Sequence, residues 1–324
     1  MTEKNLKDII TKKALQLGFD KIGFANPSQQ VDPNNYFDEW IQSNYHGTMK
    51  WMESRKEERK NIFNYFPEVK TVISLAFNYF TKRSSEFSQN CNSDIKFSNY
   101  AWGDDYHKVI KDKLHLIKDT ISDYDLSIKT LVCVDTAPIM EKKWAEKAGI
   151  GWQGKNTNLL TKDLGSWIFL AEILIDQEME YDIPFSEDLC GTCTACIDAC
   201  PTNALTEYKI DSNKCISYLT IEYRENFEDV NLHQWIYGCD ICQEVCPWNI
   251  KFEQVKKDQQ FEPRESLVQF FKKDWKNLNQ DNFKSGFSNS AVKRTKYNGL
   301  KRNIESLYFF YLFIVLRDFK SLWQ

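Results

Sequence analysis

The chain of 324 residues is 42% hydrophobic and 27% charged, with 12 glycines and 8 prolines. This composition is typical of a folded globular protein and excludes collagen-like, low-complexity and disordered chains. The 42 basic and 46 acidic residues give a net charge of -4, so any contact with nucleic acid must come from a local basic patch rather than from a global positive field.

The N-terminal segment lacks the apolar centre and cleavage site of a signal peptide. The longest apolar run, at residues 307–316, has ten residues. A membrane-spanning helix needs about 20. We therefore expect a soluble, cytoplasmic protein without membrane contact.

Hydrophobic periodicity predicts alternating helices and strands up to about residue 180. The predicted helices cover residues 6–17, 106–121 and 138–148, the last opened by a proline. The predicted strands cover residues 71–80, 128–134 and 167–175. The pattern breaks at residues 182–188. We therefore predict three parts, namely an α+β domain over residues 1–180, a cysteine-rich module over 181–250 and a short helical C-terminal region over 251–324.

Eight of the ten cysteines lie between Cys190 and Cys246. Thiols clustered in a chain without an export signal indicate metal binding rather than a disulfide framework. The first four, followed by a proline, form the C-x2-C-x2-C-x3-C-P run of bacterial ferredoxins, in which the fourth cysteine binds the other cluster.

A second, incomplete run follows at Cys239, Cys242 and Cys246, with Ile236 in place of its first cysteine, and Cys215 can supply the missing ligand. The spacing thus predicts a bacterial ferredoxin-like module with two 4Fe-4S clusters. One cluster would be held by Cys190, Cys193, Cys196 and Cys246, and the other by Cys200, Cys215, Cys239 and Cys242. Two four-cysteine zinc sites are the alternative. Zinc prefers well-separated C-x2-C pairs, so the two Cys-Pro endings favour iron–sulfur.

Three strings precede these cysteines in order, NYAWGDDYHK at residues 99–108, VDTAP at 134–138 and GIGWQGKN at 149–156. Together with the two-cluster pattern they resemble the epoxyqueuosine reductases, cobalamin- and iron–sulfur-dependent enzymes of the last step of queuosine synthesis in tRNA. The resemblance covers residues 1–303. It implies that an N-terminal α/β domain binds cobalamin, that the clusters feed it electrons, and that the epoxide oxygen of the modified wobble base is removed. It also implies a tRNA partner, an external low-potential electron donor and a monomer.

Asp135 aligns with the proton donor of that family. It follows a predicted strand, and the alkoxide formed when an epoxide opens needs a proton. A carboxyl desolvated by corrin and base can have its pKa raised enough to supply that proton near neutrality. From the residues alone, Asp135 could equally cap the helix that follows.

The resemblance also implies other contacts. Cobalamin contacts, besides Asp135, are expected at Arg59, Tyr106, His107, Gly154, Lys155, Asn156 and Ser217. Contacts to tRNA are expected at Arg224, Lys293, Arg294 and Lys296. Taken alone, residues 106–107 could instead cap or pack a helix start, and residues 154–156 could form an ordinary glycine-containing turn. The cations near residue 300 suit phosphate, but such runs are commonly solvated faces.

Two other functions stay open at this point. One is a dehalogenase-like corrinoid and iron–sulfur reductase of a small molecule, against which the basic stretch near residue 300 argues. The other is an electron-transfer or corrinoid-handling protein without catalysis, which has no use for a proton donor at Asp135. Beyond Asn303 the resemblance ends. The apolar run at residues 307–316 could cover a core, mediate self-association or be an aggregation liability if exposed.

Overall fold

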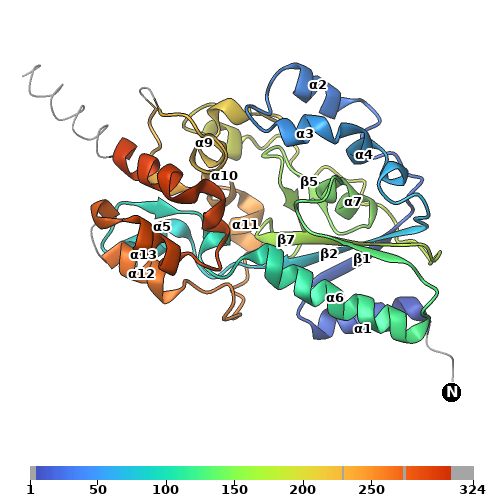
Figure 1. The fold of residues 1–324 in the computed structure, drawn as a ribbon. Helices are drawn as coiled ribbons and strands as arrows, with labels where there is room; N and C mark the ends of the chain where they lie inside the picture. The colour runs from blue at the N-terminus through green and yellow to red at the C-terminus, as the bar shows by residue number, and fades with distance from the viewer. Residues whose placement is uncertain (1–4, 228–229, 273–274, 308–324) are drawn as a thin grey trace, which may run out of the picture.

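The computed structural model describes residues 5–227, 230–272 and 275–307 (Figure 1). Its first part is built on a four-stranded sheet with the order β1-β2-β7-β4. The strands are β1 (Lys21–Ala25), β2 (Thr71–Asn78), β4 (Thr130–Cys133) and β7 (Ile168–Ile175). All three pairings are antiparallel, so the sheet is of the α+β kind that the sequence predicted. Nearly all of the predicted apolar tail lies outside the described residues.

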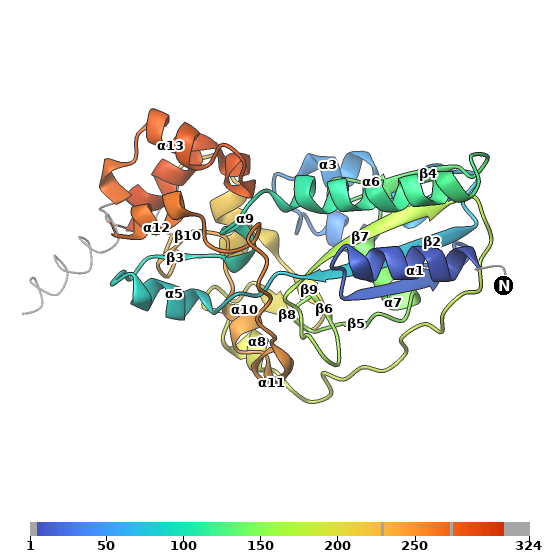
Figure 2. The same ribbon diagram turned by 90° about the horizontal axis from the view of Figure 1, so that it is seen from below.

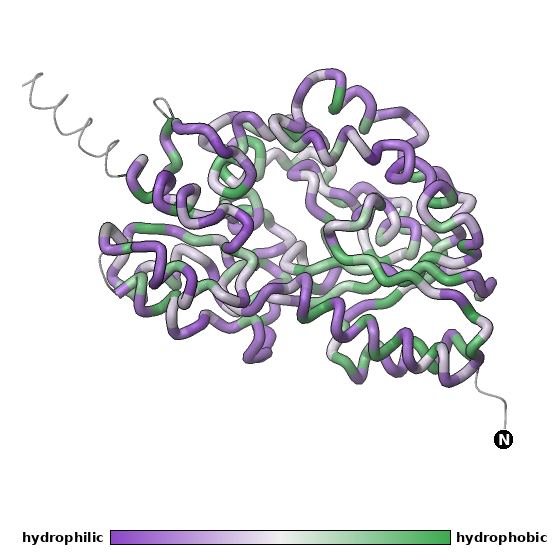
Figure 3. Tube along the Cα trace, in the orientation of Figure 1, coloured by the Kyte–Doolittle hydropathy of each residue, from purple (hydrophilic) through white to green (hydrophobic). Residues whose placement is uncertain are grey.

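Helices cover both faces of this sheet (Figures 1 and 2). On one face lie α1 (Leu6–Gln16) and α6 (Tyr106–Tyr124), which bury their apolar stripes against the odd-numbered side chains of β7. On the other face lies α7 (Glu141–Lys147), whose Trp144 packs against Leu174. Hydrophobic residues are accordingly concentrated on the strands (Figure 3). The predicted helices and strands of this domain are confirmed, except that the third helix begins at Glu141 rather than at Pro138.

Short elements complete this part of the chain. Between β1 and β2 lie α2 (Tyr36–Gln42), α3 (Lys50–Ser54), α4 (Lys56–Lys60) and the 3-10 turn η1 (Ile62–Asn64). After α7 comes a hairpin of β5 (Trp152–Gln153) and β6 (Leu159–Leu160). No helix among the described residues is both long and apolar enough to cross a membrane.

The segment of residues 84–102 leaves the sheet and packs with the C-terminal region. It contains α5 (Ser84–Asn90), β3 (Lys96–Phe97) and η2 (Asn99–Ala101), and β3 pairs in parallel with β10 (Trp235–Tyr237). The C-terminal elements are α12 (Glu265–Lys272), η4 (Trp275–Asn277), α13 (Gln280–Gly286), η5 (Ala291–Thr295) and a helical stretch over residues 296–307. Phe97 and Trp102 are buried in this second core. The predicted division at residue 180 therefore does not separate the two cores, because apolar periodicity does not reveal which core a segment joins.

The cysteine-rich module lies between these two parts. Its elements are α8 (Ala195–Asp198), β8 (Leu205–Thr206), β9 (Lys209–Ile210), η3 (Ser212–Lys214), α9 (Ile216–Ile221), α10 (Ile241–Glu244) and α11 (Pro247–Phe252). Asn249 of α11 ties the module to the sheet domain, accepting from the Ser166 N–H at 2.6 Å and donating to the Ser166 hydroxyl at 2.9 Å. Gly165 beside it has φ +66°, and a Cβ there would lie 2.0 Å from the Asn249 Oδ1 atom, so only glycine fits this contact.

Candidate active site and cluster cavity

Asp135 lies two residues beyond β4, in the left-handed backbone conformation with φ 52°. Residues other than glycine rarely adopt this conformation, so it needs support from neighbouring groups. Support comes from Glu141, whose Oε1 accepts the Asp135 N–H at 2.6 Å. The N-cap of α7 is Met140. Asp135 therefore does not cap that helix, and the capping alternative is excluded.

His107 connects two carboxylates. Its Nδ1 lies 2.8 Å from Asp105 Oδ1, and its Nε2 lies 2.8 Å from Asp135 Oδ2. Asp105 is also the N-cap of α6 and accepts the His107 N–H at 3.1 Å. The imidazole stacks on Tyr106 with ring centroids 4.1 Å apart, and Tyr106 stacks on Phe169 of β7 at 4.5 Å. The start of α6 thus aims His107 at the loop that follows β4.

The surroundings of this pair favour its proton on the imidazole. Burial lowers the pKa of His107, but its hydrogen bonds to Asp105 and Asp135 outweigh burial and raise that pKa to about 9. Burial raises the pKa of Asp135, yet hydrogen bonds from His107 and Tyr106 hold it below its ordinary 3.8. An imidazolium thus stands beside the half-exposed carboxylate of Asp135. The raised pKa expected of Asp135 was argued from desolvation by corrin and base, and it stays a prediction.

Two further carboxyl groups lie behind this loop. Burial and the charge of Asp135 raise the pKa of Glu141 to about 8. Glu172, in the middle of β7, is fully buried and pairs in register with Ser74 and Cys133. Sequence reasoning missed both residues. The available signal was one carboxylate, Glu172, inside the otherwise apolar run of residues 167–175.

Arg59 of α4 is the buried cation of this site, with 6% of its surface exposed. Its guanidinium lies over Trp51 at 5.6 Å, and its one hydrogen bond among the described residues is a long one of 3.5 Å to the Arg55 carbonyl. Burial lowers the pKa of Arg59, whereas the carboxylates of Asp135 and Glu141 raise it. Arg59 is thus a poorly paired cation close to the Asp135 loop.

The basic residues of the C-terminal region reach the same site. Lys293, Arg294 and Lys296 are exposed. Arg294 forms a double ion pair with Glu222 at 2.7 and 2.8 Å. Burial and His107 have the larger effects on the pKa of Asp105, and the charge of Lys293 lowers that pKa further. The charge of Arg294 likewise lowers the pKa of Asp135, with a smaller effect than burial and His107. The structure therefore brings positive charge from η5 to the His107–Asp135 pair.

Arg224 has different surroundings from the other predicted tRNA contacts. Its guanidinium donates to the carbonyls of Ile221 at 2.9 Å, Arg294 at 2.8 Å and Thr295 at 3.4 Å. These bonds hold the end of α9 against η5. Among the described contacts, Arg224 therefore joins two elements of the fold.

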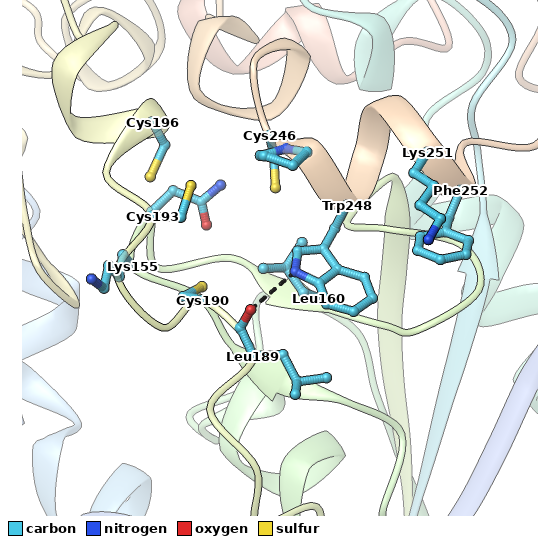
Figure 4. A pocket seen from close by; sticks show the side chains of 12 residues that line it. Lys155, Leu160, Leu189, Cys190, Cys193, Cys196, Cys246, Trp248, Lys251 and Phe252 are labelled. Atoms are coloured by element: carbon cyan, nitrogen blue, oxygen red, sulfur yellow. Dashed lines mark hydrogen bonds between the residues drawn. The ribbon is translucent and has the colours of Figure 1, made fainter.

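A cavity of about 330 Å³ lies beside the first cysteine run (Figure 4). Its walls include Cys190, Cys193, Cys196 and Cys246, the set predicted for one cluster. Within the described part of the chain, no three His, Cys, Asp or Glu side chains gather closely enough to hold a single metal ion. Four thiols around a space fit a multi-atom cluster better than a zinc ion, which needs sulfur ligands at about 2.3 Å.

The other four cysteines form a second group deeper in the module. Burial raises the pKa of Cys242, and so do the charges of Cys215, Asp240, Cys196 and Cys200, in that order. Burial and the charges of Cys242 and Cys215 also raise the pKa of Cys239. These four cysteines therefore lie near one another and near Cys196, and their assignment to a second cluster stays a prediction. Ile236, at the position of the missing cysteine, lies on β10 and is buried in the second core.

The turn of residues 154–156, predicted to contact cobalamin, lies against the cysteine groups. Lys155 and Asn156 line the cavity, Lys155 is ion-paired to Glu207 at 2.7 Å, and Asn156 Nδ2 donates to the Cys242 carbonyl at 3.3 Å. A Cβ on Gly154 would lie 2.5 Å from Leu160, so the turn packs closely here. The remaining predicted contact, Ser217, lies in α9 two residues after Cys215.

Comparisons with known proteins agree with this geometry. Residues 189–249 match the 4Fe-4S double cluster binding domain, and residues 59–136 match the family described as epoxyqueuosine reductase QueG, DUF1730. The epoxyqueuosine reductase of Cellulophaga algicola is 41% identical over 310 residues, which cover 94% of this chain and 99% of the relative. That of Cyclobacterium marinum is 43% identical, over 91% of this chain and 94% of the relative.

Solved structures of the same kind are also similar. A selenomethionine-labelled epoxyqueuosine reductase matches with a TM-score of 0.78 and 30% identity, over 92% of this chain and 80% of the other. An epoxyqueuosine reductase with an epoxyqueuosine-modified tRNA-Tyr stem loop matches with a TM-score of 0.77, 29% identity and the same coverage. The Bacillus subtilis enzyme, in a form whose catalytic aspartate loop is swung out of the active site, has a TM-score of 0.77 and 28% identity, again with that coverage.

The mixed α and β fold, the double cluster domain and the similar reductases define an iron–sulfur oxidoreductase. More particularly, the chain belongs to the epoxyqueuosine reductase family.

Proposed function

We propose that this protein reduces epoxyqueuosine to queuosine at the wobble position of tRNA, with Asp135 as the proton donor. The conversion of an epoxide to an alkene and water consumes two electrons and two protons. The electrons would enter singly through the two clusters. The protons must reach the departing oxygen, which is the task assigned to the His107–Asp135 pair.

The 2.8 Å contact between His107 Nε2 and Asp135 Oδ2 carries the proposal. His107, with a pKa of about 9, holds the proton at neutral pH and delivers it through the Asp135 carboxylate to the departing oxygen. A protein that only carries electrons has no need of such a pair. The half-exposed side chain of Asp135 leaves its other face accessible to a substrate.

The residues around Asp135 fit a cobalamin, the cofactor expected from the family. A buried guanidinium with one long hydrogen bond, as at Arg59, is suited to the polar side groups of a corrin. The residues that would hold the corrin are Arg59, Tyr106, His107, Gly154, Lys155, Asn156 and Ser217. When bound, cobalamin supplies a low-potential cobalt centre for reduction of the epoxide carbon.

We assign the first cluster to Cys190, Cys193, Cys196 and Cys246, and the second to Cys200, Cys215, Cys239 and Cys242. The exposure of Cys193 supports electron entry at the first cluster from an external low-potential donor. Asn156, which lines the first cavity and bonds the Cys242 carbonyl, supports close contact between the two cysteine groups.

The stem-loop complex of the related enzyme and the exposed cations at residues 293–296 support tRNA as the substrate. Lys293, Arg294 and Lys296 would contact phosphates close to the reacting base. Positive charge beside the proton donor favours a polyanion over a small organohalide. A tRNA substrate also implies a cytoplasmic reaction. We propose that the protein acts as a monomer, with an N-terminal cobalamin domain, the cluster module and a helical C-terminal region in that order.

The test is anaerobic incubation of the protein, carrying both clusters and cobalamin, with epoxyqueuosine-containing tRNA and a strong reductant, followed by mass spectrometry of the nucleosides. Loss of one oxygen from the modified base is the expected result. An unchanged nucleoside, with iron and cobalt contents verified, contradicts the proposed substrate. Reduction of an organohalide by the same preparation would instead support the small-molecule alternative.

A further inference from the structure

The carboxyl group of Glu141 is the structural support of the Asp135 turn. Asp135 adopts a left-handed backbone conformation, which costs a residue with a side chain about 1 kcal/mol or more. The one polar contact that the structure gives to the Asp135 N–H is Glu141 Oε1, at 2.6 Å. Because the direction of the peptide N–H depends on the backbone angles of the turn, this bond favours the conformation that aims the Asp135 carboxylate at His107.

Glu141 is well placed to act as a fixed support. It is the first residue of α7, and the following turn of this helix packs Trp144 and Ala145 into the core below the sheet. The next residue, Lys142, donates to the Thr157 carbonyl at 2.8 Å and so connects the helix to the turn beside the cysteines. The position of the Glu141 carboxyl is therefore set by rigid elements on both sides.

Glu172 lies behind Glu141 on the face of β7 that α7 covers. It has no exposed surface, its Oε1 accepts from the Ser74 hydroxyl at 3.5 Å, and its Oε2 has no hydrogen-bond partner among the described residues. Burial and then the charge of Glu141 raise its pKa well above the ordinary value. A buried carboxyl in this situation keeps its proton and can donate it to a neighbouring carboxyl.

The charged groups that face Glu141 come from several elements. Asp135 and His107 lie on the side of the active site, Lys142 follows on the same helix, and Arg59 approaches from α4. Burial raises the pKa of Tyr106 and of Cys133, and the charge of Glu141 raises both further. The cationic groups act on both Asp135 and Glu141, so none of them pairs with Glu141 alone.

We propose that Glu141 is a positioning residue for the reaction, which holds the Asp135 turn through its carboxyl oxygen, and that Glu172 supports Glu141 from the buried side. The catalytic importance of this support rests on the proposed role of Asp135. This positioning role depends on the length of the Glu141 side chain, which brings an oxygen to the Asp135 N–H, rather than on its charge. An amide of equal length can therefore replace the Glu141 carboxyl, whereas a shorter carboxylate cannot.

Four variants test this inference: Glu141→Gln, Glu141→Asp, Glu141→Ala and the control Glu146→Ala. Glu146 lies on the same helix, is partly buried and pairs with Lys143 at 3.4 Å, away from Asp135. Amide hydrogen exchange of residues 134–140, followed by mass spectrometry, reports on the turn without any substrate. Turnover of modified tRNA and the Kd for tRNA are measured on the same preparations, with iron content as the check on folding.

We expect Glu141→Gln and Glu146→Ala to stay within about threefold of the wild type in loop exchange and kcat. We expect Glu141→Asp and Glu141→Ala to exchange about tenfold faster and to lose about 10- to 100-fold in kcat with an unchanged Kd, the size of effect that a misplacement of about 1 Å produces. Higher activity in Glu141→Asp than in Glu141→Gln would show that charge matters more than reach and would overturn the inference. Wild-type loop exchange in Glu141→Ala would overturn it as well. If the wild type fails to reduce tRNA, the proposed function fails, while the exchange ranking still decides the role of Glu141.

Discussion

The Nε2 atom of His107 lies 2.8 Å from Oδ2 of Asp135, although the two residues are 28 positions apart and belong to different elements. The contact joins the first turn of α6 to the loop that follows β4. It changes the chemistry expected of Asp135, because a carboxylate next to an imidazolium is ionised at neutral pH. We therefore propose the pair as the acid of this site, with the proton on His107 and its delivery through Asp135.

Replacement of Asp135 with Asn should abolish proton delivery while the fold is kept. We expect kcat to fall by about 100-fold or more, the usual contribution of a positioned general acid. Iron content, cobalamin binding and the Kd for tRNA should not change. The matched control is Asp119→Asn, which makes the same chemical change at an exposed aspartate in the C-terminal half of α6. Wild-type turnover in Asp135→Asn would remove this residue from the mechanism.

The pH dependence should follow His107. Its pKa of about 9 in the folded protein predicts that kcat is constant near neutrality and falls as the pH rises through about 9. His107→Gln should lower kcat and lose this limb of the pH profile. A rate profile of the wild type that is flat to pH 10 would contradict the assignment of the proton to His107.

The same shift links stability to pH. The folded pKa of His107 lies above its ordinary 6.5, so the stabilisation by its two carboxylate partners is complete below pH 6.5 and is lost as the pH rises through about 9. Because the side chain is 35% exposed, solvent screening reduces the effect to about 1 kcal/mol. Anaerobic thermal unfolding should therefore show a difference in Tm between wild type and His107→Gln that is larger at pH 6.5 than at pH 9.5.

The two cysteine groups should lose iron separately. The wild type should bind about eight iron atoms, as two 4Fe-4S clusters require. Cys196→Ser should disturb the cluster of the cavity, and Cys242→Ser the second cluster, each with a loss of up to about four iron atoms. Cys91, which lies far from both groups in sequence and packs against the second core, is the control, and Cys91→Ser should keep all of the iron. Equal iron loss in all three variants would contradict the assignment.

Contact between residues 293–296 and tRNA should be visible in the salt dependence of binding. Replacing Lys293 and Lys296 together with Ala should weaken binding and reduce the slope of log K against log salt by about 1 to 2, the value expected for two lost phosphate contacts. Lys12→Ala, on the exposed face of α1, is the control and should leave the slope unchanged. An unaltered slope in the double variant would place the tRNA elsewhere.

Much of this protein can be predicted from the sequence because the relevant signals are local. The ligand spacing of the cysteine runs is set by the chain itself, so the double cluster domain was recognisable without a structure. The apolar stripe of residues 106–121 and the apolar runs of the neighbouring strands likewise predict directly which side chains are buried. The position of Asp135 just after a strand was also evident.

The rest was decided by tertiary contacts between distant residues. Periodicity shows that a segment is buried but not against what, so the sequence could not reveal that residues 84–102 join the C-terminal core. Pro138 is compatible with a helix start, yet α7 begins only at Glu141, after the turn at Asp135. Most importantly, the protonation of Asp135 depends on His107 and Glu141, because a pKa is determined by the groups that surround a carboxyl in space.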